Sequence, residues 1–112
     1  PMLNIGEGRS IWLWTEVTDM RRSFNELSAQ VRRHLNEDPV QGDWYVFINR
    51  RRTQLKILAF EAGGYCLWSK RLEQGCFARP SSYACKLSLS RTALLALLDG
   101  IDIVIIKTTK TL

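Results

Sequence analysis

The fold is decided by residues 43–77, which read DWYVFINRRRTQLKILAFEAGGYCLWSKRLEQGCF. Aromatic and β-branched side chains, which fit a pleated surface, fill residues 44–48. Two further apolar stretches, 55–60 and 65–72, follow at the spacing of hairpins. The pattern predicts a three-stranded antiparallel meander over residues 44–72.

The meander is rich in positive charge, and its first link carries three adjacent arginines. One interpretation is a solvated hairpin tip whose charges discourage edge-to-edge aggregation. The other is a phosphate clamp, in which guanidinium groups bind phosphate oxygens in pairs. The candidate contact residues are Arg50, Arg51, Arg52, Lys56, Lys70 and Arg71, with Arg21 and Arg22 as an extension before the first helix.

Length and composition indicate one globular domain over residues 1–112, with loose segments at 1–9 and 107–112. A hydrophobic content of 46% with 24% charged residues argues against disorder. The net charge of +5 favours an anionic partner.

The rest of the chain predicts a strand near residues 11–15 and a short strand at 86–89. Helices are expected over about 23–36 and 91–99, because their leucines and valines recur at helical spacing. Residues 101–106 are a further strand candidate. The expected fold class is α+β, a mainly antiparallel sheet with both helices packed on one face.

The first helix has two candidate beginnings. Ser23 and Glu26 have the spacing of a capping box, which would start the helix at Phe24. Thr18 or Asp19 is the alternative cap. In either case we expect Asp19 to have a structural role.

The three cysteines, Cys66, Cys76 and Cys85, include no CxxC pair. We expect reduced thiols that pack as small hydrophobic residues, and no metal site, because structural zinc sites usually show closely spaced ligand pairs. The four tryptophans, at positions 12, 14, 44 and 68, are expected mainly in the core, with base stacking or a partner-protein contact as the alternative.

Catalytic motifs are absent from the sequence: it contains no glycine-rich phosphate loop, GxSxG or HExxH. His34, the only histidine, is interpreted as part of a solvated helix end. We therefore expect no catalytic residue, no cofactor and no small-molecule substrate. No apolar run approaches the ~20 residues of a membrane span, and residues 1–4 lack signal-peptide features, so a cytoplasmic location without membrane contact is expected.

Several motifs together resemble the TnpB accessory proteins (Orf2-like) of insertion-sequence 66 transposable elements. They are TDMRRSF at 18–24, VFINRR at 46–51, GYCLWSKRLEQGCF at 64–77, and an LS…L..LL.GID pattern over 89–102. The resemblance covers about residues 10 to 102, in the family's order and spacing. Two departures stand out: Arg52-Thr53 replaces a common Gly-Asp turn, and the tail lacks the arginine-rich ending of many members.

The resemblance implies a bacterial mobile-element protein that works beside a larger transposase, to which the strand chemistry of such elements is attributed. We therefore expect a non-enzymatic accessory protein for transposition that contacts DNA, such as the ends of the element, through the basic meander. The alternative is an adaptor that binds the transposase through exposed aromatic or apolar surface. Exposed basic residues on one face would favour DNA, and an exposed apolar patch would favour the adaptor.

Overall fold

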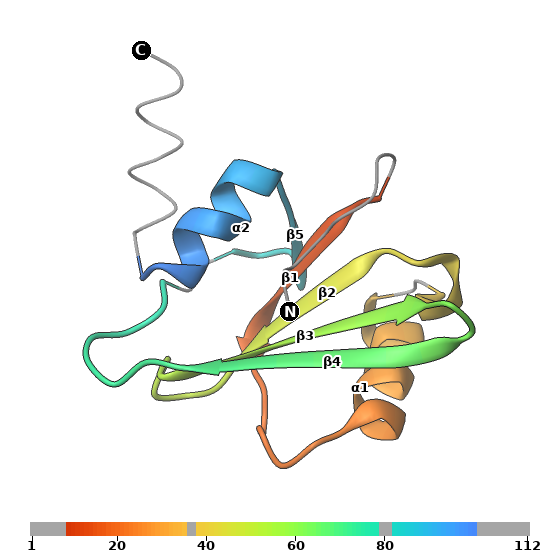
Figure 1. Ribbon diagram of the computed structural model, residues 1–112, viewed down its shortest axis with the longest axis horizontal. Helices are drawn as coiled ribbons and strands as arrows, with labels where there is room; N and C mark the ends of the chain where they lie inside the picture. Colours follow the sequence, from red (N-terminus) through yellow and green to blue (C-terminus); the bar gives the residue numbers. More distant parts are fainter. Residues whose placement is uncertain (1–8, 36–37, 79–81, 101–112) are drawn as a thin grey trace.

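Five strands form one sheet in the order β4-β3-β2-β1-β5 (Figure 1). A computed structural model describes residues 9–35, 38–78 and 82–100. β1 and β2 are parallel, and the other neighbours are antiparallel. The strands are β1 (Ile11–Val17), β2 (Trp44–Ile48), β3 (Gln54–Glu61), β4 (Gly64–Arg71) and β5 (Lys86–Leu89). The predicted meander and the strands near 11–15 and at 86–89 are confirmed.

The helices join β1 to β2 and follow β5. They are α1 (Phe24–Gln30), the π-helical turn η1 (Val31–Leu35), the 3-10 turn η2 (Pro39–Gln41) and α2 (Arg91–Leu98). A parallel pair of strands needs a crossover connection, and α1 and η1 supply it between β1 and β2. The α+β class is confirmed.

The two helices lie on opposite faces of the sheet, so the expectation that both would pack on one face is wrong (Figure 1). All five residues of β2 are buried. Trp44, Val46 and Ile48 join a core cluster with α2, whereas Tyr45 and Phe47 join a second cluster with α1 and η1. Successive side chains of a strand point to opposite faces, so a strand that is apolar at every position requires a cover on each face.

The first helix begins as the capping-box spacing predicts. Ser23 is the N-cap, and its backbone N–H donates to the Glu26 carboxylate at 2.9 Å. The apolar stripe of Leu27, Val31 and Leu35 is buried and continues through η1. The helix predicted over about 23–36 is thus α1 followed by η1, and position 36 lies outside the described residues.

The second helix has a side-chain cap. The Ser90 hydroxyl accepts a hydrogen bond from the Ala93 backbone N–H at 3.0 Å. Leu94 and Leu97 are fully buried against the sheet. Gly100 follows the helix with φ +80, the left-handed conformation that commonly ends helices. The strand candidate at 101–106 and the segments 1–8 and 107–112 lie outside the described residues.

The cysteines do not pack as small hydrophobic residues. Cys66, Cys76 and Cys85 are free and exposed. Cys66 lies on the edge strand β4, and the other two lie in connecting segments, where no second layer covers them.

The tryptophans lie mainly in the core, as expected. Trp14 and Trp44 are buried, while Trp12 and Trp68 are partly buried against the two clusters.

Of the described residues, no helix is both long and apolar enough to cross a membrane.

Candidate nucleic-acid interface

The link between β2 and β3 is a braced turn. The Asn49 Oδ1 atom accepts hydrogen bonds from the backbone N–H groups of Thr53 and Gln54 at 2.9 and 3.0 Å. The Arg52 N–H donates to the Asn49 carbonyl at 3.0 Å. Arg52 has φ +59, a left-handed conformation that few residues other than glycine, Asn and Asp adopt. The Asn49 side chain stabilises a backbone conformation in which residue 52 is strained.

The segment after β4 braces the same turn from the other side. The Phe77 N–H donates to the Arg52 carbonyl at 2.6 Å, and the Leu72 N–H donates to the Thr53 carbonyl at 2.8 Å. Phe77 is fully buried in the cluster beneath α2. The turn is therefore anchored to the hydrophobic core and does not behave as a free loop.

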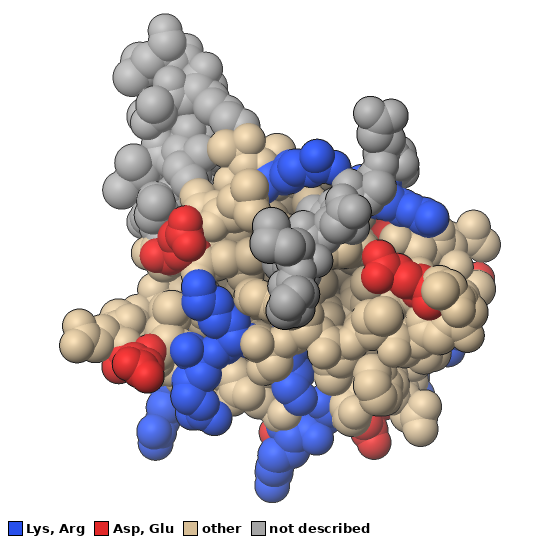
Figure 2. Space-filling view, in the orientation of Figure 1, with Lys and Arg blue, Asp and Glu red and all other residues tan. Residues whose placement is uncertain are grey.

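The side chains of this turn project into solvent. Arg50, Arg51 and Arg52, here called the arginine tip, are all exposed. Their guanidinium groups make no hydrogen bond or ion pair with any other described residue. Three consecutive residues thus carry cations that have no partner among the described residues. Figure 2 shows Lys and Arg gathered at the lower left of the molecule, where Figure 1 draws this turn and the end of β4.

The two predicted lysines are held by backbone carbonyls. Lys56 Nζ donates to the carbonyls of Met20 and Arg22 at 2.6 and 2.8 Å. Lys70 Nζ donates to the Leu98 carbonyl at 2.7 Å, where a cation offsets the negative end of α2. Both ammonium groups bind the protein itself.

These lysines also lie on opposite faces of the sheet. Lys56 pairs across the strands with Phe47, which packs beneath α1, and Lys70 pairs with Leu55, which packs beneath α2. The predicted set of basic residues therefore does not share one face. None of the predicted contact residues of the meander is within ion-pair distance of a described carboxylate. These residues are Arg50, Arg51, Arg52, Lys56, Lys70 and Arg71.

Arg21 is neutralised by its neighbour. Its guanidinium donates to both oxygens of Asp19, with Nη2 at 2.7 Å, and its backbone N–H donates to Oδ1 at 2.9 Å. The side-chain and then the backbone hydrogen bonds from Arg21 lower the pKa of Asp19 from 3.8 to about 2. Arg21 and Asp19 form a closed turn, and the structural expectation for Asp19 agrees with this geometry.

The last two predicted cations have neutral partners. Arg22 Nη1 donates to the Gln30 side chain at 2.8 Å, and Arg71 Nη2 donates to the Gln54 side chain at 3.1 Å. A bond to a neutral amide leaves the positive charge unbalanced. Both side chains therefore remain able to attract an anion.

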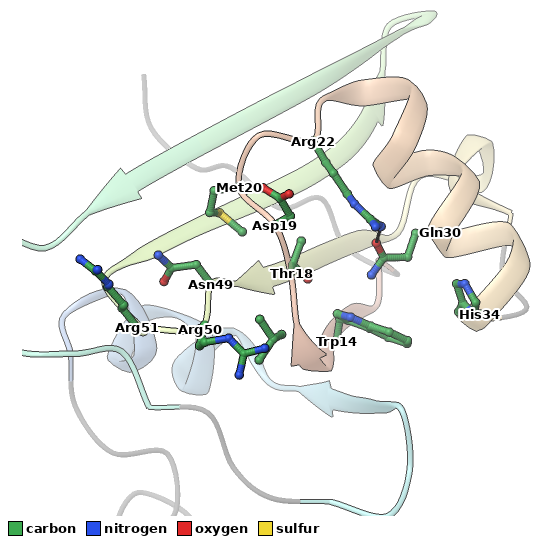
Figure 3. Close-up of a pocket in the computed structure, with 11 residues that line it drawn as sticks. Trp14, Thr18, Asp19, Met20, Arg22, Gln30, His34, Asn49, Arg50 and Arg51 are labelled. Carbon is green, nitrogen blue, oxygen red and sulfur yellow. Dashed lines mark hydrogen bonds between the residues drawn. The ribbon is translucent and has the colours of Figure 1, made fainter.

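An open pocket of about 680 Å³ lies beside the arginine tip. Two residues of the tip, Arg50 and Arg51, form part of its wall, and Arg22 forms another part (Figure 3). Arg22 and the tip belong to segments that are far apart in the sequence and become neighbours because β1 and β2 are paired. In Figure 3, Arg50 points toward the side of the pocket where Trp14 lies, and Arg51 points away from it.

A second hollow of about 410 Å³ continues from the pocket along α1. The two hollows share Arg22, Gln30 and His34, and the second adds Arg33. The Glu26 carboxylate also lines the second hollow, but it accepts the Ser23 N–H, which lowers its pKa. A basic path thus leads from the arginine tip to the exposed side of α1 and η1.

The part of this path that α1 and η1 supply was not predicted from the sequence. Gln30, Arg33 and His34 have the spacing of one helical face, which was the available signal. A charged helix face is ordinarily just solvated, so spacing alone did not distinguish the two cases. His34 is exposed near a helix end, and its ring lies 6.0 Å from that of Trp14.

Within the ranges that the structure describes, no three His, Cys, Asp or Glu side chains come together as a metal site requires.

Comparisons with known proteins agree with the motifs. Residues 9–108 match the family described as IS66 Orf2 like protein. Two relatives come from Sinorhizobium fredii (strain NBRC 101917 / NGR234), and both are described as uncharacterised. Protein y4hO is 37% identical over 101 residues, which span 90% of this chain and 88% of the relative. Protein y4jC is 33% identical over 101 residues, which span 90% of this chain and 86% of the relative. No solved structure matches significantly.

Proposed function

Since the chain belongs to the IS66 Orf2-like family of transposition-associated proteins, we propose that it is a non-enzymatic accessory factor that binds DNA phosphates through the arginine tip. The observation that carries the proposal is that three adjacent residues expose guanidinium groups without a protein partner among the described residues. They are presented on a turn that is anchored to the core, so binding requires little ordering of the loop.

The chemistry of the tip suits phosphate more than base edges. Guanidinium groups bind phosphate oxygens bidentately, and such contacts position a protein on DNA without reading its sequence. The net charge of +5 adds a long-range attraction. The contact surface proposed here is smaller than the basic meander of the sequence analysis, because Lys56, Lys70 and Arg21 are held by protein groups.

The adaptor hypothesis is the second candidate. It would use exposed apolar side chains, which among the described ranges are those of Val17, Phe24, Val40, Tyr83 and Leu95. A transposase of the same element remains a proposed second partner, recruited beside the bound DNA.

The test is a salt titration with the substitutions Arg50→Gln, Arg51→Gln and Arg52→Gln combined in one variant. A plot of log affinity against log salt has a negative slope, and each lost phosphate contact should make it shallower by roughly 0.9. The slope of the triple variant should therefore be shallower by about 2 to 3. Two unrelated duplexes of equal length should be affected about equally. Folding should change little, because exposed charges contribute little stability.

The matched control removes three positive charges elsewhere, through Arg9→Gln, Arg32→Gln and Arg91→Gln. It lowers the net charge equally but leaves the tip intact, so most of the wild-type slope should be retained. A folded tip variant with the wild-type slope would exclude the phosphate-clamp role and put the adaptor function first.

A further inference from the structure

The pocket beside the arginine tip has two chemically different walls. Arg22, Arg50 and Arg51 contribute positive charge, whereas Val17 and Met20 contribute apolar surface. Val17 is 39% exposed although it belongs to a strand of the sheet. The volume of about 680 Å³ falls within the range of sites for small molecules and exceeds what one phosphate group fills.

Two residues of the pocket wall carry polar atoms that lack a partner. Trp14 Nε1 and Thr18 Oγ1 are buried and have no hydrogen-bond partner among the described residues. Both atoms are enclosed by the protein itself, so an occupant of the open pocket does not contact them, and the charge and shape of the pocket decide what it can receive.

We propose that this pocket receives one unpaired nucleotide of a DNA strand. The phosphate binds the arginines of the pocket wall, and the base packs against the exposed side chain of Val17. A paired base cannot enter, because its faces are covered by its neighbours in the duplex, whereas an unpaired base offers a free face. The proposal rests on the function proposed above and adds the class of DNA that the site prefers.

The surroundings of the pocket fit a strand that continues beyond one nucleotide. The second hollow leads from Arg22 to Arg33, so a neighbouring phosphate finds a further cation. The one carboxylate in the pocket wall, Asp19, is paired with Arg21, which reduces its repulsion of phosphate.

The first measurement uses the wild-type protein and two DNA probes. One is a duplex with a single bulged thymidine, and the other is the same duplex fully paired. Since stacking of a base on protein is worth ≈ 1–3 kcal/mol, the bulged duplex should bind on the order of tenfold more tightly at equal salt. Equal affinities for the two probes would overturn the proposal without needing any variant.

The second measurement fills the pocket without removing charge. In Val17→Trp, a larger side chain occupies the apolar wall, so the preference for the bulged probe should disappear. Affinity for the paired duplex, and its salt slope, should stay as in the wild type. The control is Val40→Trp, which enlarges a valine of similar exposure, 45%, outside the pocket, and which should keep the preference.

The two hypotheses fail in different ways. If Val17→Trp folds and still prefers the bulged probe, the nucleotide pocket is excluded. The proposed binding of phosphate by the arginine tip is not affected by that result. If the triple variant of the arginine tip keeps the wild-type salt slope, the phosphate clamp itself fails, and the pocket proposal fails with it.

Discussion

At the scale of single residues, cations that look alike in the sequence have different partners. Lys56 binds two backbone carbonyls and Arg21 binds a carboxylate, whereas Arg50 is exposed and unpaired among the described residues. A cation that already has close protein partners must lose them to bind phosphate, and an unpaired one does not. Arg50, Arg51 and Arg52 can therefore bind an anionic partner without losing an existing side-chain contact to a described residue.

Asp19 provides a test of these pairings. Its pKa is lowered from 3.8 to about 2, first by the side-chain and then by the backbone hydrogen bond from Arg21. A carboxylate whose pKa is depressed in the folded state stabilises the fold above the unfolded value. This stabilisation is present above about pH 4 and is lost as the pH falls through about 2.

We expect Arg21→Gln to raise the pKa of Asp19 toward 3.8, measured by carboxyl NMR titration. Arg33→Gln is the control, because Arg33 is not among the groups that shift Asp19. A pKa that stays near 2 in Arg21→Gln would show that other groups hold the carboxylate ionised.

At the scale of elements, one ammonium group binds the turn between β1 and α1 to the sheet at two points. Lys56 on β3 donates to carbonyls at both Met20 and Arg22. This places Arg22 at the edge of the pocket, opposite the arginine tip. Lys56 is thus a positioning residue for the candidate interface, although its place in the basic meander predicted a direct contact.

Lys56→Met keeps the aliphatic stem but removes both hydrogen bonds. Hydrogen bonds to charged groups contribute about 1.5–3 kcal/mol each when well ordered, and solvent exposure reduces this, so we expect a loss of about 1–3 kcal/mol in the free energy of unfolding. Urea denaturation gives the value. Arg51→Gln, an exposed change on the nearby tip, should stay within about 0.5 kcal/mol. Equal stability of Lys56→Met and wild type would contradict the fastening role.

At the scale of the whole molecule, the sheet separates two hydrophobic clusters. The cluster beneath α2 includes Ile57, and the cluster beneath α1 includes Leu27. The strand β2 contributes to both, because its side chains alternate between them. Because the sheet lies between them, side chains of one cluster make little contact with side chains of the other. Substitutions in the two clusters should therefore change the free energy of unfolding independently.

We expect Leu27→Ala to cost about 2–5 kcal/mol and Ile57→Val about 0.5–1.5 kcal/mol, the usual range for such core truncations. In the double variant the two losses should add within about 0.5 kcal/mol, as for sites without shared partners. Urea denaturation of the four proteins tests this. A coupling energy above 1 kcal/mol would mean that the two clusters form one cooperative core.

Much of the fold follows from local pattern in the sequence. The strand segments, the capping box at Ser23 and the cap at Ser90 depend on neighbouring residues and on side-chain alternation, so they were predictable. The family also follows from short motifs in a fixed order. The burial of the cysteines was mispredicted, because residue type alone does not show which segments lack a covering layer.

The tertiary structure alone decided which face each helix covers and which cations remain available. A strand such as β2, apolar at every position, is compatible with a cover on either face, so its sequence does not assign the helices. Lys56 binds the Met20 carbonyl, 36 residues away in the sequence, and Lys70 binds the Leu98 carbonyl, 28 residues away. Patterns among neighbouring residues cannot predict contacts at such separations. The pocket arises in the same way, because pairing of β1 with β2 brings the turn containing Arg22 beside the arginine tip.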